Sequence, residues 1–227
     1  MNLLDSYLTN FHVDVPAKLG SDESEATVAC LSRLMEARDP ITHAHSKRVS
    51  DLAFLVSGGM HLSVSRCVEI AKATLLHDIG KLALPLEIIS KPTGLTLAET
   101  TLVRSHCVLG EAILSGTGHP VLDLAAEISV QHHERFSGGG YPRGLSGEEI
   151  SLPSRIVNLC DVYDALRRDR PYRPGLDHTG AMRVIIAGDE RTSPDQFDPD
   201  VLRQFFLMNS RIEERYQKPT DAEHPFM

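Results

Sequence analysis

The sequence predicts an all-α protein with a single helical domain, and three observations support this prediction. Apolar residues recur at helical spacing along most of the 227 residues. Residues that cap or stop helices separate these segments, and no stretch alternates polar and apolar residues as a half-buried strand would. A hydrophobic fraction of 41% and a charged fraction of 24% are typical of a globular chain with one substantial core.

Three helices are expected in the first third of the chain, over residues 24–37, 43–58 and 63–78. The first has four apolar side chains at helical spacing, namely Val28, Leu31, Leu34 and Met35. The second is expected to end at the glycine pair 58–59, because glycine is a poor helix former. The third leads into His77 and Asp78, so a polar pair follows an apolar stretch, where burial is costly without partners.

Two further helices are expected before residue 133. Thr96 and Glu99 form the pattern of a capping box, which predicts a helix over residues 97–114. The apolar stripe of that helix consists of Leu102, His106, Leu109 and Ile113. The stripe of the next helix consists of Val121, Leu124, Ile128 and His132. Each stripe therefore contains a histidine among apolar residues.

The C-terminal part begins with a glycine-rich loop, RFSGGGYPRG, where a regular helix is not expected. Pro153 suits the first turn of the following helix. One face of that helix carries Ile156, Val157, Cys160, Asp161 and Asp164. The last two helices are expected over residues 178–187, ended by Gly188, and 199–215, opened by Asp198 and Pro199.

These segments predict one folded domain over residues 26–215. We expect residues 1–25 to form an N-terminal arm and residues 216–227 to form a disordered C-terminal tail. The chain shows no internal repeat.

Charge and composition exclude several classes of protein. The net charge of −8 argues against a binder of duplex nucleic acid, although bound divalent metals would still let a site accept a small anion. No signal sequence and no run of roughly 20 apolar residues is present, so we expect no membrane contact. The cysteines lack a CxxC pair and are expected to be reduced and structural: Cys30, Cys67, Cys107 and Cys160. The expected location is the cytoplasm.

Seven polar residues lie on apolar helix faces or at helix ends: His45, His77, Asp78, His106, His132, His133 and Asp161. Helical bundles commonly build metal sites from side chains of several helices in this way. A single core histidine is more often a hydrogen-bonded structural residue than a ligand, but burying all seven without a cation would be costly. The set therefore predicts a metal site. Three other histidines lie in segments expected to be loops and should be exposed to solvent: His61, His119 and His178.

The ligand types indicate the metal and the chemistry. Imidazoles and carboxylates without thiolates suit Fe, Mn, Zn or Ni. Seven ligands are too many for one ion with an open position, and a carboxylate such as Asp78 can bridge two ions. Two ions about 3.5–4 Å apart can clamp the attacking and leaving oxygens of a phosphoryl displacement. We expect a binuclear site that acts on phosphate, with Lys81 as a nearby cation.

The ordered set of His45, His77-Asp78 and Asp161 resembles the HD superfamily of metal-dependent phosphohydrolases. More specifically, the chain resembles the HD-GYP class of cyclic di-GMP phosphodiesterases, through the segments EARDPITHAHSKRV, HDIGK, KPTGLTLAE, HHERFSGGGYP, DVYDALRRDRPYR and FDP. The similarity runs from about Glu36 to Asp198. HDIGK alone indicates only the superfamily, whereas HHE followed by GYP and RPYR is more specific.

The resemblance implies a ligand set for two ions, which we expect to be Fe or Mn. It implies that the first ion is bound by His45, His77, Asp78 and Asp161. It implies that the second is bound by His106, His132, His133 and the bridging Asp78. The implied substrate contacts are Lys81, Tyr141, Arg170 and Arg173, and Asp164 matches a position beside the bridging water.

The implied reaction is attack of a metal-bridging hydroxide on phosphorus, which opens cyclic di-GMP to linear pGpG and leaves further hydrolysis to GMP open. Asp78, Lys81 and Asp164 are then the expected catalytic residues. A second cyclic dinucleotide, such as a cyclic GMP-AMP, is an open alternative substrate. From a different class, the chain could be a weakly active signalling module that binds a diguanylate cyclase through the GYP loop, but all seven ligand positions are filled.

Three departures from the family pattern matter. Ser137 stands where the family usually has aspartate, which concerns the loop and not a ligand. Ile41 stands where members with a third metal carry a carboxylate, so we expect two ions. Family members usually carry an upstream receiver or sensor domain, whereas only about 25 residues precede this core, so we expect a sensor partner or the N-terminal arm to provide input. A homodimer is left open.

Overall fold

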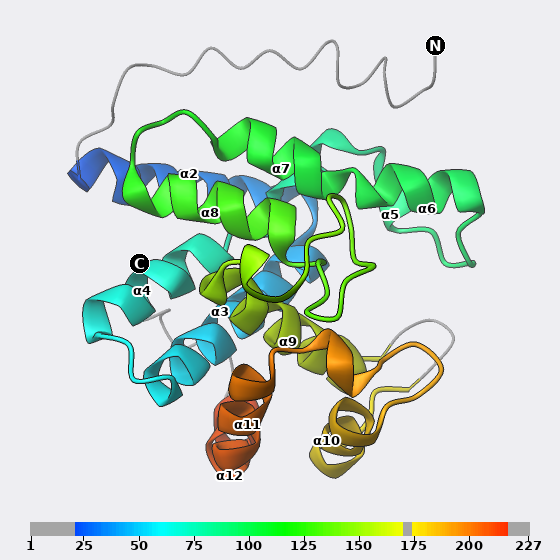
Figure 1. The fold of residues 1–227 in the computed structure, drawn as a ribbon. Helices are drawn as coiled ribbons and strands as arrows, with labels where there is room; N and C mark the ends of the chain where they lie inside the picture. The colour runs from blue at the N-terminus through cyan, green and yellow to red at the C-terminus, as the bar shows by residue number, and fades with distance from the viewer. Residues whose placement is uncertain (1–20, 170–173, 218–227) are drawn as a thin grey trace.

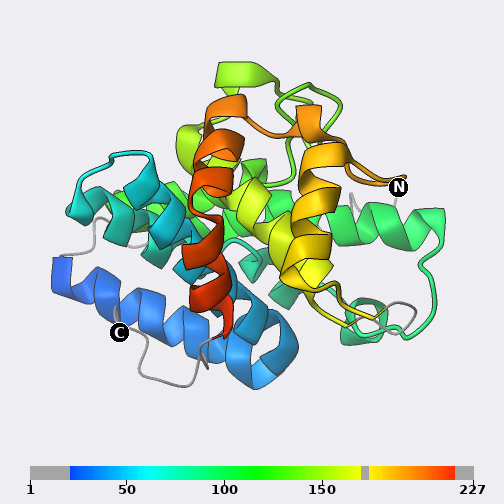
Figure 2. The same cartoon turned by 90° about the horizontal axis from the view of Figure 1, so that it is seen from below.

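The computed structural model describes residues 21–169 and 174–217, and all regular secondary structure within these ranges is helical. Figure 1 shows α2, α7 and α8 together on one side of the molecule, and α10, α11 and α12 on the opposite side. Helices α3, α4 and α9 lie between these groups in that view. Figure 2, seen from below, shows the C-terminal helices α10, α11 and α12 nearest the viewer. The predicted all-α fold with a single helical domain is confirmed.

The helices follow one another with short connections. The N-terminal half contains α2 (Ser21–Arg38), α3 (Pro40–Gly59), α4 (Val64–Thr74), the 3₁₀ helix η1 (Ile79–Ala83) and α5 (Leu86–Ile89). The middle contains α6 (Leu97–Arg104), α7 (His106–Leu114) and α8 (Pro120–Gln131). The C-terminal part contains η2 (Gly147–Glu149), α9 (Leu152–Arg167), α10 (His178–Ala187), η3 (Pro194–Gln196), α11 (Pro199–Leu207) and α12 (Asn209–Gln217).

The hydrophobic core lies where α3 packs against α4 and α9, and where α4 packs against α8. One face of α3 is fully buried there, with Val49, Leu52, Ala53 and Val56. Burial of such apolar side chains is the main favourable contribution to folding. Within the described ranges, no helix has the length and apolar content needed to cross a membrane.

The predicted helix boundaries that depend on local capping are confirmed. Thr96 and Glu99 form both hydrogen bonds of the capping box at the start of α6. Pro153 occupies the first turn of α9, and the side chain of Asp198 caps α11. Gly188 ends α10 with a φ of 82°, which favours glycine. These signals act within one turn, so the sequence alone reveals them.

Three helices that were expected to be continuous are interrupted. The helix expected over 63–78 ends at Thr74, and the one expected over 97–114 breaks at Ser105. In both places Nδ1 of a following histidine, His77 or His106, lies within hydrogen-bond distance of the carbonyl oxygen three positions earlier. The helix expected over 199–215 breaks at Met208, for which the structure offers no physical account.

Two further expectations differ from the structure. His178 was expected to be solvated but is 7% exposed. Its ring nitrogens lie 2.9 Å from the Tyr163 hydroxyl oxygen and 3.0 Å from Asn209 Oδ1, so it is a structural core histidine. Helix α12 also continues past residue 215, and the ring of Tyr216 packs against Tyr163.

Gly80 lets η1 lie directly against the start of α7. A Cβ atom at this position would be 1.9 Å from the carbonyl oxygen of His106 and 2.6 Å from the backbone nitrogen of Gly110. Any larger residue would therefore push the two segments apart. This close approach brings the segment that carries Asp78 and Lys81 next to His106.

Candidate metal centre

Three of the predicted ligands, His77, His106 and His132, stand just after the ends of helices α4, α6 and α8. In each, Nδ1 lies 2.6–2.9 Å from the carbonyl oxygen of the residue three positions earlier. The last carbonyl groups of a helix have no partner within the helix, so the ring can donate its Nδ1–H to one of them. This contact fixes the ring orientation and leaves the lone pair of Nε2 for another partner.

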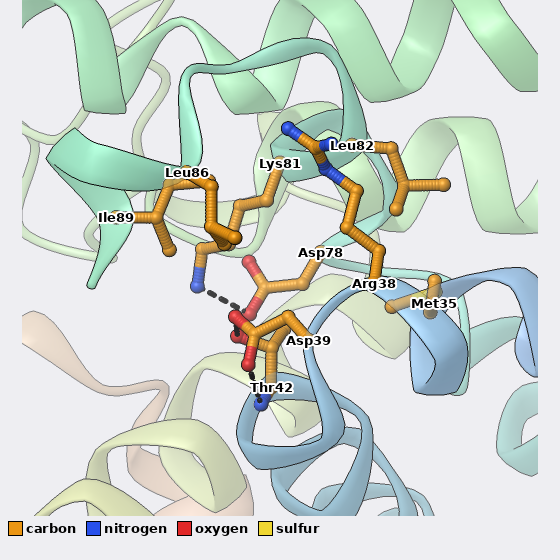
Figure 3. Close-up of a pocket in the computed structure, with 9 residues that line it drawn as sticks. All are labelled: Met35, Arg38, Asp39, Thr42, Asp78, Lys81, Leu82, Leu86 and Ile89. Carbon is orange, nitrogen blue, oxygen red and sulfur yellow. Dashed lines mark hydrogen bonds and ion pairs between the residues drawn. The ribbon is translucent and has the colours of Figure 1, made fainter.

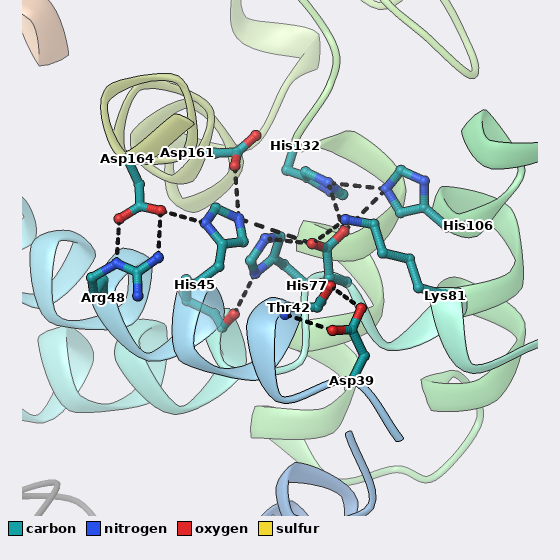
Figure 4. Close-up of polar contacts among 12 residues, drawn as sticks. Asp39, Thr42, His45, Arg48, His77, Lys81, His106, His132, Asp161 and Asp164 are labelled. Atoms are coloured by element: carbon teal, nitrogen blue, oxygen red, sulfur yellow. Dashed lines mark hydrogen bonds and ion pairs between the residues drawn. The ribbon is translucent and has the colours of Figure 1, made fainter. Parts of the chain in front are cut away.

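Figure 4 shows the rings of these three histidines directed toward one another. Their Nε2 atoms converge on the carboxylate of Asp78. His77 Nε2 lies 3.5 Å from Asp78 Oδ2, while His106 and His132 Nε2 lie 3.4 and 4.0 Å from Oδ1. Asp78 is 2% exposed, and within the described residues neither its Oδ1 nor His77 Nε2 has a hydrogen-bond partner. Buried polar atoms are rarely left unpaired. Several lone pairs that face one buried space fit a bound cation.

His45, on α3, faces the same carboxylate from the other side. Its Nε2 lies 3.0 Å from Asp161 Oδ1 and 3.9 Å from Asp78 Oδ2. Its Nδ1 lies 2.7 Å from Asp164 Oδ2. Asp161 and Asp164 are one turn apart on α9, so the same helix face supplies a carboxylate to each nitrogen of the ring.

Arg48 is a residue of the site that sequence reasoning missed. It follows His45 by three positions on α3, a spacing that could have revealed it. Its Nε and Nη2 donate to the two oxygens of Asp164 at 2.7 and 3.0 Å. Asp164 was expected beside a catalytic water, and that role remains a prediction; in the structure it lies on the Nδ1 side of His45. Its contacts are those of a residue that positions a ligand.

The turn that carries His132 and Glu134 is held by hydrogen bonds to its backbone and to the glutamate. Asn158 Nδ2 donates to the carbonyl oxygen of His132 at 2.8 Å and to that of Glu134 at 3.3 Å. Glu134 Oε1 accepts from the backbone N–H groups of Arg143 and Gly144 at 2.6 and 3.1 Å. These contacts tie both ends of the glycine-rich loop to the ligand turn.

Tyr141, of the GYP segment, packs behind His133. The two rings are 4.8 Å apart between centroids and inclined by 30°. The guanidinium of Arg104, the last residue of α6, lies 4.7 Å from the centroid of the Tyr141 ring. Gly140 permits this arrangement, because a Cβ atom there would be 2.7 Å from the carbonyl oxygen of His133. The predicted contact of Tyr141 with substrate remains a prediction.

Burial sets the protonation states of the site. It lowers the pKa of His106 and of His132 to about 4, so both rings are neutral at pH 7. Burial also opposes a charge on His45, but hydrogen bonds to Asp161 and Asp164 outweigh it and raise the pKa of His45 to about 9. In the metal-free protein His45 is therefore protonated, and a metal at its Nε2 must displace that proton.

Lys81 provides a second positive charge at the same carboxylate. Its Nζ donates to Asp78 Oδ2 at 2.6 Å, and the side chain is 26% exposed. Figure 3 shows Lys81 and Asp78 at the edge of a small cavity of about 10 Å³. Its other walls come from α2, α3, η1 and α5, and it has room for about one water molecule.

A cleft of about 740 Å³ opens beside these residues, which is within the usual size range of ligand sites. Four ligand candidates line it: His45, Asp78, His133 and Asp161. Its walls include three basic residues, namely Arg48, Lys81 and Arg168. Within the described part of the chain, residues 136–142 do not line this cleft. Ile41 lines it and is 83% exposed.

The structure brings all seven predicted metal ligands together. Two groups have potential ligand atoms within 4.8 Å of one another: His45, His77 and Asp78 in one, and His106, Cys107, His132 and His133 in the other. Asp161 lies beside both groups, through His45 and through His133 at 3.9 Å. Arg170 and Arg173 lie outside the described residues. Ser137 is exposed on the glycine-rich loop, and Cys107, which was expected to be structural only, lies within the second group.

Comparison with known proteins agrees with this geometry. Residues 29–201 match the HD domain family. The chain belongs to this family. The match includes every residue of the two ligand groups, and the resemblance to the HD-GYP class is confirmed. HD domain phosphohydrolases are metal-dependent, and the His/Asp group of this chain could bind metal.

Two curated relatives and one solved structure define the likeness. A cyclic di-GMP phosphodiesterase of Thermotoga maritima is 37% identical over 193 residues, which are 85% of this chain and 51% of that protein. The 3'3'-cGAMP-specific phosphodiesterase 3 of Vibrio cholerae is 37% identical over 161 residues, 71% of this chain and 35% of that protein. An HDGYP protein of Bdellovibrio bacteriovorus shares the fold, with a TM-score of 0.59 and 16% identity over 85% of this chain and 62% of that one. The chain thus spans about half the length of the first relative and about a third of the second.

Proposed function

We propose that this domain is a metal-dependent phosphodiesterase that hydrolyses cyclic di-GMP to linear pGpG. The observation that supports this most directly is the pair of buried atoms without a hydrogen-bond partner among the described residues, His77 Nε2 and Asp78 Oδ1, where Asp78 lines a cleft of about 740 Å³. A cleft of that size accommodates a nucleotide ligand. The relative from Thermotoga maritima bears the name of this activity.

We assign two divalent cations, Fe or Mn, to the centre. One is held by His45, His77, Asp78 and Asp161, and the other by His106, His132, His133 and the shared Asp78. When bound, such cations lower the pKa of a water molecule and balance the negative charge that develops on a phosphate.

The protein's own residues orient these ligands and bind the substrate. Asp164 and Arg48 hold His45, so that Nε2 faces Asp78 and Asp161. Lys81 lies at the cleft with Nζ directed to Asp78, close enough to exchange that contact for a substrate phosphate. We propose the same phosphate-binding role for Arg170 and Arg173, as the resemblance implies.

The test uses purified protein loaded with Fe or Mn under anaerobic conditions and offered cyclic di-GMP, with chromatographic separation of the products. Linear pGpG should form, and a chelator should abolish its formation. Asp78→Ala should lose both metal and activity, because Asp78 faces every ligand group. Asp200→Ala changes an exposed carboxylate on α11 and should retain both. Intact cyclic di-GMP after incubation with fully metal-loaded protein would contradict the proposal.

Lys81 allows a separate test of substrate contact. Lys81→Met should reduce turnover while leaving both ions bound, because a cation near the phosphate is lost and no ligand is removed. Lys91→Met is the control, since Lys91 pairs with Glu99 at 2.7 Å and does not line the cleft. Loss of metal in Lys81→Met would mean that the lysine supports the centre and not the substrate.

A second cyclic dinucleotide is the alternative substrate. The cGAMP-specific phosphodiesterase of Vibrio cholerae has the same identity to this chain as the cyclic di-GMP phosphodiesterase of Thermotoga maritima, 37%. Comparing kcat/KM for cyclic di-GMP and 3'3'-cGAMP separates the two substrates. If the metal-loaded protein hydrolyses neither, a signalling module that binds a diguanylate cyclase becomes the better account. We also propose a cytoplasmic location, which the four free cysteines support.

A further inference from the structure

Cys107 lies inside the second ligand group, although it plays no part in the ligand set assigned above. Its side chain is fully buried, and its Sγ lies 3.5 Å from His106 Nε2. The potential ligand atoms of Cys107, His106, His132 and His133 all lie within 4.8 Å of one another. The thiol therefore stands among the atoms that would hold the second ion.

The separation of Sγ from Nε2 is that of two ligands on one ion. A metal–nitrogen bond is about 2.05 Å long and a metal–sulfur bond about 2.3 Å. Two such bonds separate nitrogen from sulfur by about 3.1 Å at a right angle and by about 3.6 Å at the tetrahedral angle. The observed 3.5 Å lies within this interval.

A second, independent observation indicates a cation at the same place. Asp78 Oδ1 is buried, has no hydrogen-bond partner within the described residues, and lies 3.4 Å from the same Nε2 atom of His106. Nε2 of His132 also approaches, at 3.3 Å from that of His106. A carboxylate oxygen, a second imidazole nitrogen and a sulfur atom thus lie 3.3–3.5 Å from one Nε2 atom of His106, and the carboxylate oxygen has no donor among the described residues.

We propose that Cys107 is a ligand of the second metal ion, bound as a thiolate whose proton leaves to solvent when the metal binds. The inference rests on the metal centre of the proposed function and deepens it. The second ion then has a thiolate beside the imidazoles of His106, His132 and His133 and the carboxylate of Asp78. The competing account is a hydrogen bond from the thiol to His106 Nε2 with no role in metal binding.

A thiolate changes which ion this site prefers. Soft sulfur ligands favour Zn²⁺, Fe²⁺ and Co²⁺, whereas Mn²⁺ prefers carboxylate and carbonyl oxygens. The ligands of the first ion include two carboxylates and no sulfur, so that site lacks the additional preference that a thiolate gives. We therefore expect the second site to select Zn²⁺ over Mn²⁺. Loss of a residue that only hydrogen-bonds to a metal ligand typically lowers metal affinity by about tenfold or more. Cys107→Ala, which removes a ligand itself, should therefore lower the Zn²⁺ affinity by at least about tenfold.

The test is the absorption spectrum of the Co²⁺-loaded protein, with bound cobalt counted by elemental analysis. A thiolate ligand gives a sulfur-to-cobalt charge-transfer band in the near ultraviolet, which nitrogen and oxygen ligands do not give. The wild type should show this band, and Cys107→Ala should lose it. Cys160→Ala is the matched control, because Cys160 is equally buried and adjacent to Asp161 but belongs to neither ligand group.

The possible outcomes separate this inference from the proposed function. Cobalt bound to wild type without the charge-transfer band would overturn the inference and leave the metal centre intact. A band that persists in Cys107→Ala but disappears in Cys160→Ala would overturn it as well. Failure of wild type to bind any cobalt would overturn the metal centre together with this inference. If Cys107→Ala fails to fold, the wild-type and Cys160→Ala spectra decide: a band present in both supports Cys107, and a band that is absent from wild type or lost in Cys160→Ala overturns the inference.

Discussion

Replacing Asp164 with asparagine should destabilise the protein and weaken metal binding at the same time. Asp164 is 1% exposed and receives three contacts, one from His45 Nδ1 and two from Arg48. Asparagine keeps the shape of the side chain but removes its charge. Arg48 then keeps a positive charge without its bidentate partner, and His45 loses the carboxylate that orients its ring.

The burial of the Asp164–Arg48 pair sets the expected loss of stability, and the contact of Asp164 with His45 sets the expected loss of metal affinity. Removing one partner of a buried ion pair costs about 3–5 kcal/mol, and the lower value of about 3 kcal/mol applies because the Arg48 side chain is 13% exposed. For a domain of this size each kcal/mol corresponds to about 2–4 °C, so the melting temperature should fall by about 6–12 °C. Loss of a carboxylate that supports a metal-bound histidine typically lowers metal affinity by about 10–100-fold.

The assay combines thermal unfolding of the metal-free protein with metal titration of the folded protein. A double variant, Arg48→Met with Asp164→Leu, separates the two effects. It removes both charges, so its melting temperature should lie closer to wild type than that of the single variant. Its metal affinity should stay low, because His45 still lacks a partner at Nδ1.

The reasoning is refuted if Asp164→Asn melts within about 2 °C of wild type and binds metal with unchanged affinity. A normal metal affinity in the double variant would show that packing of α3 against α9, and not Asp164, orients His45.

Three further predictions concern the surroundings of the centre. Gly80→Ala should cost about 1–3 kcal/mol and lower metal content, because its Cβ would overlap the carbonyl oxygen of His106. Gly58→Ala, on α3 with nothing within 4 Å of its Cβ, should leave metal content unchanged and should not lower the melting temperature, as metal analysis and thermal unfolding would show. Tyr141→Ala should weaken metal binding at His133's site without changing the fold, as titration and circular dichroism would show; equal affinity would rule out a supporting role. The metal-free protein should be most stable near pH 6.5 in melts from pH 4 to 9. Burial lowers the pKa of His106 to about 4, so protons favour the unfolded chain below pH 6.5. Despite burial, hydrogen bonds to two aspartates raise the pKa of His45 to about 9, so its stabilising contribution is complete below pH 6.5 and is lost as the pH rises to 9. A flat profile would contradict both shifts.

Much of the fold and of the ligand set could be predicted from the sequence. Capping residues such as Thr96 and Asp198 act through neighbours within one turn, so their effect is visible in the chain itself. The ligand histidines could be found because titratable residues on apolar stripes, such as His106 and His132, need a partner in the core.

The features that the sequence did not reveal depend on contacts between distant segments. The orientation of the His106 ring at the break after α6 is recognisable only once Asp78, from another segment, lies 3.4 Å from its Nε2. The spacing of Arg48 from His45 places it on the same face of α3, but its role became visible only when α9 brought Asp164 against it. In the sequence, Cys107 looks like an ordinary buried cysteine. Only the packing of α8 against α7 places its sulfur beside His132 and His133.

Anomalous X-ray diffraction from crystals of the metal-loaded protein tests the binuclear centre most directly. The account predicts two peaks about 3.5–4 Å apart on either side of the Asp78 carboxylate, one beside His45 and Asp161 and the other beside His106 and His132. A single peak, or peaks remote from Asp78, would contradict it.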